Sequence, residues 1–394
     1  MIQITVDDTT DGASVATVRL RDEGGRLSDG TKFKVGSALK VSLGHAGRVK
    51  PVFEGEVTGW KGTFPRRGNA VLTVIAHDKF HRLRRNRRQT TFANQKDSDV
   101  IAAAAQAAGL QADVTATSIT QEALLQLNHS DADFILERAS LFGYEAFVDG
   151  NKLVCRPPDL AASPVATLEW HDKLRHFVTG ISLARQQKEV KVTTWSVKDK
   201  VMRSASSLEG DERDLMGGTK PGANVIGAVD PAVFHAATTP AETQEEAAAY
   251  AKALFQKRSE RFLEGEGACE GDPNIRRGTV VEILGIGQYL AGNYYVRRAI
   301  HTLLPGSGYT TSFLVTRSAV QAPAPPPATY EREAPAAEEP HEVEPDQDPL
   351  AFEVAAPDGA PLGGVPAVIV DGSGQRHAVE LTSDGRVDVE FEES

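Results

Sequence analysis

Two histidines and one aspartate form the nearest approach to a metal-binding pattern in this sequence. His77 and Asp78 are adjacent, and His81 follows three residues later. Imidazole nitrogens and carboxylate oxygens are common zinc ligands, and these three would face one way if a helix began at His77. Two imidazoles and a carboxylate near the end of a strand are more typical of a polar surface. We therefore predict no bound metal.

A pair of glutamates offers the best candidates for acid–base chemistry. Glu264 and Glu266 lie in the run Phe262-Leu-Glu-Gly-Glu-Gly267, and their spacing of two would place both on one face of a strand. Paired carboxylates can hydrolyse glycosidic bonds, but a catalytic acid needs apolar surroundings that raise its pKa. Nothing near either glutamate marks such a pocket, so we favour a structural role. A peptidoglycan hydrolase remains the enzymatic alternative.

The sequence lacks the motifs of cofactor binding and of nucleophilic catalysis. Gly285-Ile-Gly287 has no third glycine at dinucleotide-binding spacing, and its surroundings are typical of a strand end. There is no Gly-Lys-Ser/Thr phosphate loop and no Gly-x-Ser-x-Gly elbow. Cys155 and Cys269 form no Cys-x-x-Cys pair, and we expect both to be small buried side chains. We predict no catalytic residue, no cofactor and no enzymatic activity.

A basic stretch, Lys79-Phe-His-Arg-Leu-Arg-Arg-Asn-Arg-Arg88, raises the question of nucleic-acid binding. Phe80 within it and Phe92 just after it could stack on bases. The stretch is short, however, and many acidic residues surround it. We favour a solvated helix face or a contact with an acidic neighbouring subunit over a nucleic-acid partner.

Length and composition describe a soluble protein of several folded units. The 394 residues exceed one ordinary domain, and 40% hydrophobic with 25% charged residues is close to the globular average. No window approaches the roughly 18 apolar residues of a membrane helix, so we expect no stable membrane insertion. The start, Met1-Ile-Gln-Ile-Thr-Val6, has no signal-peptide pattern, and two cysteines fit a reducing compartment. We expect synthesis in the cytoplasm.

The net charge of −11 is concentrated near the end of the chain. Residues 320–349 hold eight acidic residues and one basic residue, giving −7, and residues 350–394 hold nine acidic and two basic, again −7. Residues 1–319 therefore carry +3. A nearly neutral body with an acidic tail gives no global preference for nucleic acid.

Periodicity divides the chain into five parts. Residues 1–78 show period-two alternation and turn signals, which predict a small β-barrel or sandwich, and residues 166–319 are again mostly β. Residues 79–165 form an α+β block, residues 320–349 are a linker with eight prolines, and residues 350–394 are a small β domain. The predicted strands cover 13–20, 38–43, 51–57, 70–76, 144–148, 152–155, 177–183, 189–197, 279–284, 294–303, 310–316, 352–354, 367–370, 377–381 and 387–391.

Three longer helices are predicted from capping signals. The first covers 97–109, with Asp97 or Ser98 as N-cap and Gly109 at its end. The second begins after Ser130, which Asp133 accompanies in a capping-box pattern, and ends at Gly143. The third covers about 240–262, with Thr239 as cap and Glu242 three residues later. Lys79–Arg88 could form a fourth, short helix.

The order of several short motifs resembles the phage late control protein D family. This family includes baseplate hub proteins of contractile phage tails and the hub portion of the VgrG spikes of type VI secretion. The matching motifs extend over about 300 residues: Val18–Leu27, Phe33–Gly36, Leu39–Gly44, Val52–Thr58, Ala76–Asp78, Arg82–Arg85, Thr91-Phe92, Ser98–Ile101, Ala108–Leu110, Asn128–Asp131, Asp133–Leu136, Gly143, Arg277-Gly278, Gly292–Val296, His301 and Tyr309–Phe313.

The resemblance implies a homotrimeric ring. Each chain would supply two related small β-barrels, residues 1–78 and 166–319, with the α+β block outside, and the ring would join a sixfold tail tube to a threefold spike. A VgrG continues into a further barrel and a β-helical spike, whereas this chain enters its Pro/Glu-rich linker. The resemblance therefore implies a separate spike protein. The last segment is similar to small transthyretin- or immunoglobulin-like extensions through Asp358–Leu362 and Thr382–Gly385.

The sequence thus predicts a mainly β protein with an α+β insertion that serves as a structural baseplate hub. Its partners would be copies of itself, a tail tube protein, a separate spike and other baseplate subunits. It would be incorporated into a phage tail or an injection particle. Two alternatives stay open: the hydrolase above, and a receptor- or glycan-binding tip protein that uses residues 350–394.

Overall fold

The chain consists of two units in a computed structural model. Met1–Pro325 form the first unit and Pro326–Ser394 the second. The structure describes residues 2–30, 32–45, 48–226, 233–237 and 241–321, together with the backbone of four strands between residues 350 and 389. Each unit is described separately.

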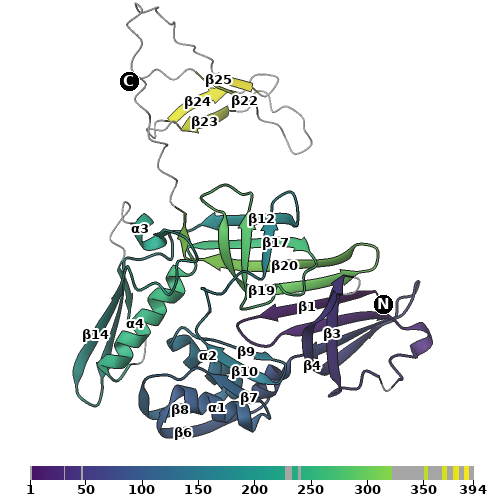
Figure 1. Cartoon of the computed structure of the whole chain (residues 1–394), viewed down its shortest axis with the longest axis horizontal. Helices are drawn as coiled ribbons and strands as arrows, with labels where there is room; N and C mark the ends of the chain where they lie inside the picture. Colours follow the sequence, from purple (N-terminus) through teal and green to yellow (C-terminus); the bar gives the residue numbers. More distant parts are fainter. Residues whose placement is uncertain are drawn as a thin grey trace, which may run out of the picture. The chain divides into compact units, whose positions relative to one another are not determined.

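One large, mostly antiparallel sheet organises the first unit, and β11 and β18 are its parallel pair. Its strands follow the order β12-β17-β20-β19-β1-β2-β5-β4-β3, with β18 beside β19 and β11 beside β18. Strands from the start and the end of the unit therefore lie side by side (Figure 1). The strands are β1 (Gln3–Thr9), β2 (Val15–Arg21), β3 (Ala38–His45), β4 (Arg48–Thr63), β5 (Val71–His77), β11 (Ala166–Glu169), β12 (Leu174–Ile181), β17 (Leu263–Glu270), β18 (Val280–Leu284), β19 (Gly292–Leu304) and β20 (Gly308–Arg317).

The β1–β19 pair joins the two β regions that the sequence separates. Thr5 pairs with Thr302, and the antiparallel register continues to Thr9 opposite Arg298. Alternation explains why these strands form: Val6 is fully buried, whereas its neighbours Thr5 and Asp7 are only partly buried. The sheets of the described residues are open, with β3 and β12 at the ends of the main one. Closure into two barrels stays a prediction.

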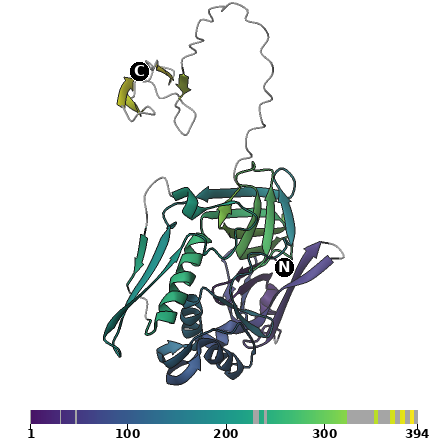
Figure 2. The ribbon, with the colours of Figure 1, turned by 60° about the vertical axis from the view of Figure 1, so that its left-hand side comes forward.

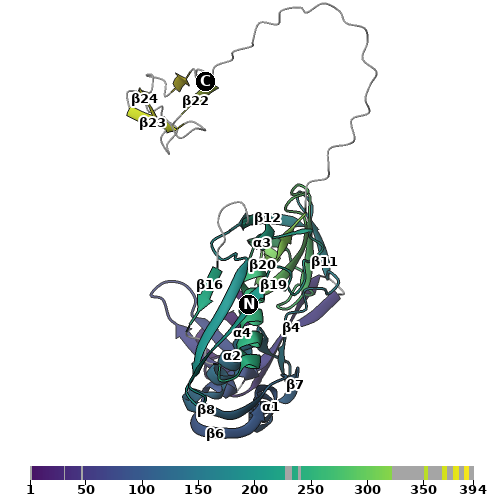
Figure 3. The same ribbon diagram turned by 90° about the vertical axis from the view of Figure 1, so that its left-hand side faces the viewer.

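The α+β block follows β5 and has its own small core. Figure 3 shows β6, β8, α1 and α2 gathered at one end of the unit. Strands β7, β10 and β9 form a three-stranded sheet, and β6 pairs with β8. The elements are the 3₁₀ helix η2 (Lys79–Arg84), β6 (Arg87–Lys96), α1 (Asp97–Ala107), β7 (Gln111–Val114), β8 (Thr120–Ser130), α2 (Asp131–Leu141), β9 (Glu145–Asp149) and β10 (Lys152–Arg156).

Several local predictions for this block are confirmed. Ser130 caps α2, because its hydroxyl accepts a hydrogen bond of 3.1 Å from the Asp133 backbone N–H. Gly143 follows the helix with φ of 66°, the left-handed conformation that glycine adopts most easily. The hairpin between β9 and β10 turns at Asp149-Gly150, and Gly150 has φ of 56°.

Two other predictions in the block are wrong. Lys96, not Asp97 or Ser98, is the N-cap of α1, and its side chain makes no capping hydrogen bond, whereas Thr117 Oγ1 accepts from the Ser98 N–H at 3.3 Å. The Asp97 carboxylate is engaged elsewhere, because Arg138 on α2 binds it. The predicted helix Lys79–Arg88 stops at Arg84 as a 3₁₀ helix, since Arg87 already pairs with Ser130 as a strand residue.

The remainder of the unit holds a second small sheet and the longest helix. Figure 2 shows α4 lying along the hairpin of β13 and β14. The predicted strands 177–183 and 189–197 belong to different sheets: β12 lies in the main sheet, and β13 pairs with β14 and β16. The elements are β13 (Glu189–Ser196), β14 (Val201–Leu208), β15 (Lys220–Pro221), α3 (Gly222–Ile226), β16 (Val233–Ala236), α4 (Gln244–Ser259) and β21 (Ala319–Val320).

Helix α4 begins later than predicted. Thr243 caps it, accepting 3.1 Å from the Glu246 N–H, while the Glu246 carboxylate accepts 2.9 Å from the Thr243 N–H. The sequence contains two Thr-x-x-Glu patterns in succession, and this reciprocal capping box forms at the second. Thr239 and Pro240, the predicted start, lie outside the described residues.

Both cysteines are buried, as predicted. Cys155 lies in the core of the α+β block with Ile135 and Leu153, and Cys269 lies in the core of the main sheet with Phe313. Burial raises the pKa of each thiol to about 12, so both are neutral at physiological pH.

The second unit contains four described strands. β22 (Leu350–Glu353) pairs with β25 (Arg386–Val389), and β23 (Pro366–Val370) pairs with β24 (Arg376–Glu380). Each of these four strands overlaps one of the predicted strands. The predicted linker falls almost wholly outside the described residues. No helix in the described part of the chain is long and apolar enough to cross a membrane.

Candidate functional site

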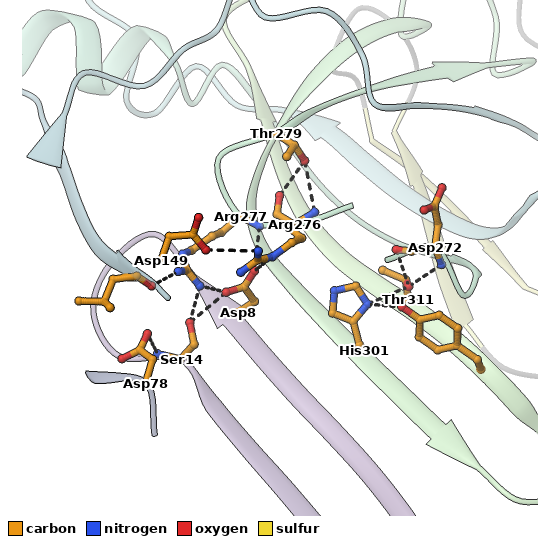
Figure 4. A network of polar contacts seen from close by, with 12 residues as sticks. Asp8, Ser14, Asp78, Asp149, Asp272, Arg276, Arg277, Thr279, His301 and Thr311 are labelled. Atoms are coloured by element: carbon orange, nitrogen blue, oxygen red, sulfur yellow. Dashed lines mark hydrogen bonds and ion pairs between the residues drawn. The ribbon is translucent and has the colours of Figure 1, made fainter. Parts of the chain in front are cut away.

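A buried charged network joins three distant segments of the first unit (Figure 4). Asp8 on β1 is 1% exposed and forms an ion pair with Arg277, which lies just before β18. The Arg277 guanidinium also donates to the Ser14 hydroxyl at 2.6 Å and to the Val148 carbonyl on β9. These bonds hold the N-terminal strands, the α+β block and the closing strands together.

Arg276 adds a second cation to the same carboxylate. Its Nε lies 3.2 Å from Asp8 Oδ2, and its Nη1 lies 3.3 Å from Asp149 Oδ1 in the β9–β10 turn. The Arg277 guanidinium stacks over the Phe147 ring, 4.6 Å from its centroid. Burial lowers the pKa of Arg277 to about 9, which leaves the side chain charged at neutral pH.

Asp78 is the least compensated carboxylate of the network. It is 3% exposed, and its two oxygens accept from the backbone N–H groups of Phe80 at 3.0 Å and Ser14 at 2.9 Å. Among the described residues, no cation lies within ion-pair distance of it. Burial raises the pKa of Asp78 to about 7, because the charged form loses more hydration than these bonds return.

A polar cavity of about 460 Å³ lies beside this network. Its walls carry charges of both signs, including Asp8, Asp78, Arg276, Arg277 and Lys152. Ser14 and Asp8 are the nearest approach to a nucleophile and base, since the Ser14 hydroxyl donates to Asp8 Oδ1 at 3.0 Å. Two arginines neutralise Asp8, however, and a carboxylate in that setting is a weak base. The arrangement favours cohesion over catalysis.

A second buried network connects the same parts of the fold. The Tyr295 hydroxyl on β19 donates to Glu145 Oε2 on β9 at 2.6 Å, and burial raises the pKa of Glu145. Arg213 donates to Glu260 Oε1, just after α4, at 2.9 Å. The Arg297 guanidinium lies near Glu145 and Glu260, and its positive charge favours the ionised form of each.

His301 on β19 is fully buried and neutral at physiological pH. Its Nδ1 lies 2.7 Å from the Tyr309 hydroxyl and 3.2 Å from Thr311 Oγ1 (Figure 4). Burial lowers the pKa of His301 to about 4. No partner of its Nε2 is found among the described residues.

The residues of the metal-like pattern diverge in the structure. His77 Nδ1 lies 2.7 Å from Thr58 Oγ1, and His81 Nε2 lies 3.0 Å from Glu56 Oε2. Asp78 instead caps η2 and belongs to the charged network. Within the described ranges, no group of three or more histidine, cysteine, aspartate or glutamate side chains could hold a metal ion.

The two candidate glutamates lie on an exposed face of the main sheet. Glu264 pairs with Arg261 at 2.7 Å and with Arg185 at 3.6 Å. Glu264 and Glu266 line an open pocket of about 530 Å³ whose walls also carry Arg297 and Arg298. This charged, exposed setting is not the apolar pocket that tunes a catalytic acid.

The aromatic residues of the basic stretch are unavailable for stacking on bases. Phe80 is fully buried in the core of the α+β block, and Phe92 packs against Phe134 with ring centroids 6.2 Å apart. Interpreting these two rings as a base-stacking platform is therefore wrong. The Gly285–Gly287 segment does end a strand, as predicted, since it follows β18 directly with φ of 78° and 82° at its glycines.

The charged network was missed at the sequence level, although a signal exists. Asp8 continues the buried face of Ile4 and Val6 on β1. A carboxylate on an apolar face demands a partner, and the adjacent pair Arg276-Arg277 supplies two cations. Nothing local connects residues 8 and 277, because the contact spans almost the whole unit.

Solved structures with a similar fold are tail proteins and a secretion-system component. A 43 kDa tail protein of prophage MuSo2 from Shewanella oneidensis has a TM-score of 0.60 at 14% identity, covering 80% of this chain and 94% of that one. A tail protein from Neisseria meningitidis MC58 has a TM-score of 0.56 at 11% identity, covering 80% and 91%. An Escherichia coli type VI secretion component, described as similar to the T4 tail proteins gp27 and gp5, has a TM-score of 0.53 at 12% identity, covering 82% and 76%.

These likenesses establish a fold shared with phage tail proteins. No curated protein sequence matches the chain. Residues 1–304 match a family model described as the Alg8 N-terminal domain. The resemblance to the late control protein D family stays a prediction. Because this match covers more than half of the sequence, the chain belongs to the Alg8 N-terminal domain family.

Proposed function

We propose that the chain is a structural baseplate hub of a contractile phage tail or contractile injection system. The observation that carries the proposal is the extent of the fold match. The Shewanella tail protein is covered over 94% of its length, so the likeness is to a whole tail protein and not to one module. A non-enzymatic role and incorporation into a tail particle belong to the same proposal.

The buried networks support a mechanical role. Asp8 and Arg277 lie within the fold with their charges compensated, and they tie three segments of chain to one another. A component that transmits force between a sheath and a spike needs such rigid internal connections. No exposed nucleophile–base pair was found in the network.

The trimeric form of the proposal rests on the open sheet. An open edge exposes unpaired backbone N–H and C=O groups, and protein folds commonly cover or pair such edges. β3 and β12 end the main row of strands, and β11 ends the branch through β18. We propose that three copies close these edges into the two barrels per chain, residues 1–78 and 166–319, that the late control protein D resemblance implies. The tail tube, a separate spike and other baseplate subunits would then be its neighbours.

The two alternatives receive less support. The hydrolase needs a tuned carboxylate, and Glu264 is exposed and paired with two arginines. The receptor-binding alternative depends on residues 350–394, of which only strand backbones are described.

Light scattering on the purified chain tests the proposal. We expect a mass of about three times 42.3 kDa for the full chain, and about three times its own smaller chain mass for a variant that ends at Pro325. The cut belongs there and not at residue 319, because Val320 is fully buried and pairs with Lys220. A monomer at every concentration would contradict the trimer. A trimer that is lost on truncation would transfer assembly to the second unit.

A further inference from the structure

One end of the main sheet exposes aromatic side chains beside a cluster of cations. Trp60 and Phe64, at the far end of β4, are 47% and 71% exposed. Val35, in the loop between β2 and β3, is 61% exposed. Exposed apolar side chains that form a contiguous patch often mark a site where a partner binds.

Hydrogen bonds hold both described ends of the loop beside these side chains. The Asp22 carboxylate accepts from the Leu27 N–H at 2.8 Å and from the Ser28 N–H at 3.2 Å. At the other end of the loop, Gly36 N donates to Val57 O at 2.7 Å. Leu27 and Phe33 pack against the core under the loop. A surface that is fixed before binding loses little conformational entropy when a partner arrives.

A pocket of about 270 Å³ lies between this loop and the sheet. Five of its eight lining residues are apolar, namely Leu27, Phe33, Val35, Trp60 and Leu72, and the others are Ser28, Gly30 and Lys34. The pocket can therefore receive an apolar side chain and also presents polar groups beside it.

Exposed cations lie on the chain segments that supply the pocket's lining, and Lys34 is part of the lining itself. Arg26, Lys32 and Lys34 on the loop and Arg66 and Arg67 in the β4–β5 turn are all exposed. In the part of the chain that the structure describes, none of the five has a carboxylate within ion-pair distance. The exposed acids nearby are Glu23, which is 3.8 Å from Arg21, and Asp29.

We propose that this surface docks an acidic protein segment that inserts one apolar side chain into the pocket. The uncompensated cations attract acidic residues, and the apolar walls match an aliphatic or aromatic anchor. A nucleic acid and an anionic membrane share the attraction to the cations, so both are outcomes that the test distinguishes. The surface and its test do not depend on the baseplate proposal.

Fluorescence anisotropy with the full-length chain tests this inference. The probe is a labelled peptide of aspartate and glutamate with one central phenylalanine, and its matched control carries alanine there. We expect a dissociation constant below about 100 μM for the phenylalanine peptide and about tenfold weaker binding of the alanine peptide. Raising the salt from about 0.05 to 0.3 M should weaken binding several-fold.

Variants distinguish this surface from general basicity. The double substitution Arg66→Glu/Arg67→Glu and the single substitution Trp60→Ala should each weaken binding about tenfold. Arg85→Glu/Arg87→Glu makes the same charge change at another exposed basic site and should alter binding less than about twofold. Equal losses in both double variants, or no peptide binding below about 1 mM, would overturn the inference. Tighter binding of an oligothymidine or of vesicles with anionic lipid, lost in the same variants, would replace the protein partner with that class.

Discussion

Asp8, Asp78 and His301 are three ionisable side chains that folding removes from water, and each is accommodated differently. Two arginines compensate Asp8. His301 stays neutral, because burial lowers its pKa to about 4. Asp78 has hydrogen-bond donors but no cation within ion-pair distance among the described residues, and burial raises its pKa to about 7. Desolvation and the nearest partners decide the charge state of each group.

Replacing Asp78 with asparagine should change how stability depends on pH. The raised pKa means that folded Asp78 holds its proton more tightly than the unfolded chain does, whose value is near 3.8. Its stabilising contribution is therefore present below pH 3.8 and is lost as the pH rises through 7, a change of about 4 kcal/mol. His301 acts in the opposite sense, because its stabilising contribution is present above pH 6.5 and is lost as the pH falls through 4.

The two opposing contributions give the wild type a shallow profile between pH 4 and 7. In Asp78→Asn the Asp78 contribution is gone, so the free energy of unfolding of the variant should rise relative to that of the wild type by about 4 kcal/mol from pH 4 to 7. Urea unfolding at several pH values measures it. Asparagine keeps one acceptor oxygen for the η2 cap, which limits the structural cost. If the free energy of unfolding changed with pH in the same way in the wild type and in Asp78→Asn, the pKa of Asp78 would not be raised by folding.

At the scale of single elements, the sequence was informative wherever the signal is local. Alternating side chains predicted β2, β3, β4 and β5, because a strand that buries one face must place apolar residues at every second position. The cap of α2 and the Asp149-Gly150 turn depend on contacts within a few residues. Both signals are complete in the sequence itself.

Contacts between distant residues explain what was missed. The β1–β19 pair brings together residues almost 300 positions apart, and no periodicity encodes which strands become neighbours. The start of α4 was missed because two Thr-x-x-Glu patterns compete. The Asp8–Arg277 contact was missed for the same reason as the β1–β19 pair, because no local pattern identifies a partner so far along the chain. Without a known partner, the buried face of β1 could not reveal what neutralises Asp8.

Two glycines of β4 provide a test of how closely this strand packs. A Cβ at position 55 would lie 2.2 Å from the His77 carbonyl oxygen on β5, whereas a Cβ at position 59 would meet nothing within 4 Å. Gly55→Ala should therefore lower the free energy of unfolding by about 3 kcal/mol, and Gly59→Ala by less than about 1 kcal/mol. Urea unfolding of both variants measures the difference. Equal effects would mean that the strand shifts at little cost.

For the first unit as a whole, the pairing of β1 with β19 and the charged network make one connected body. The main sheet contains strands from both β regions, and the network adds the α+β block through the Val148 carbonyl. We therefore expect the unit to unfold in one cooperative step. The Asp8–Arg277 pair should contribute more to that cooperativity than its single ion pair suggests.

Arg277→Met measures that contribution, and Arg298→Met is its matched control. Arg298 links β19 to β1 through Asp7, but its side chain is 42% exposed, against 3% for Arg277. Removing Arg277 leaves the buried Asp8 charge with Arg276 alone, so Arg277→Met should cost about 3 kcal/mol. The exposed pair should be worth less than about 1 kcal/mol. Urea unfolding followed by fluorescence gives both values.

A double substitution separates the charge effect from lost packing. If the cost of Arg277→Met comes from uncompensated Asp8, adding Asp8→Asn should restore part of the stability, because the remaining charge is then gone. Arg276 would lose its Asp8 contact in this variant, but it is partly exposed and keeps Asp149. A further loss in the double variant would instead show that the stack on Phe147 and the bond to Ser14 carry the junction. Separate transitions in Arg277→Met alone would identify the pair as the link that makes the unit fold as one body.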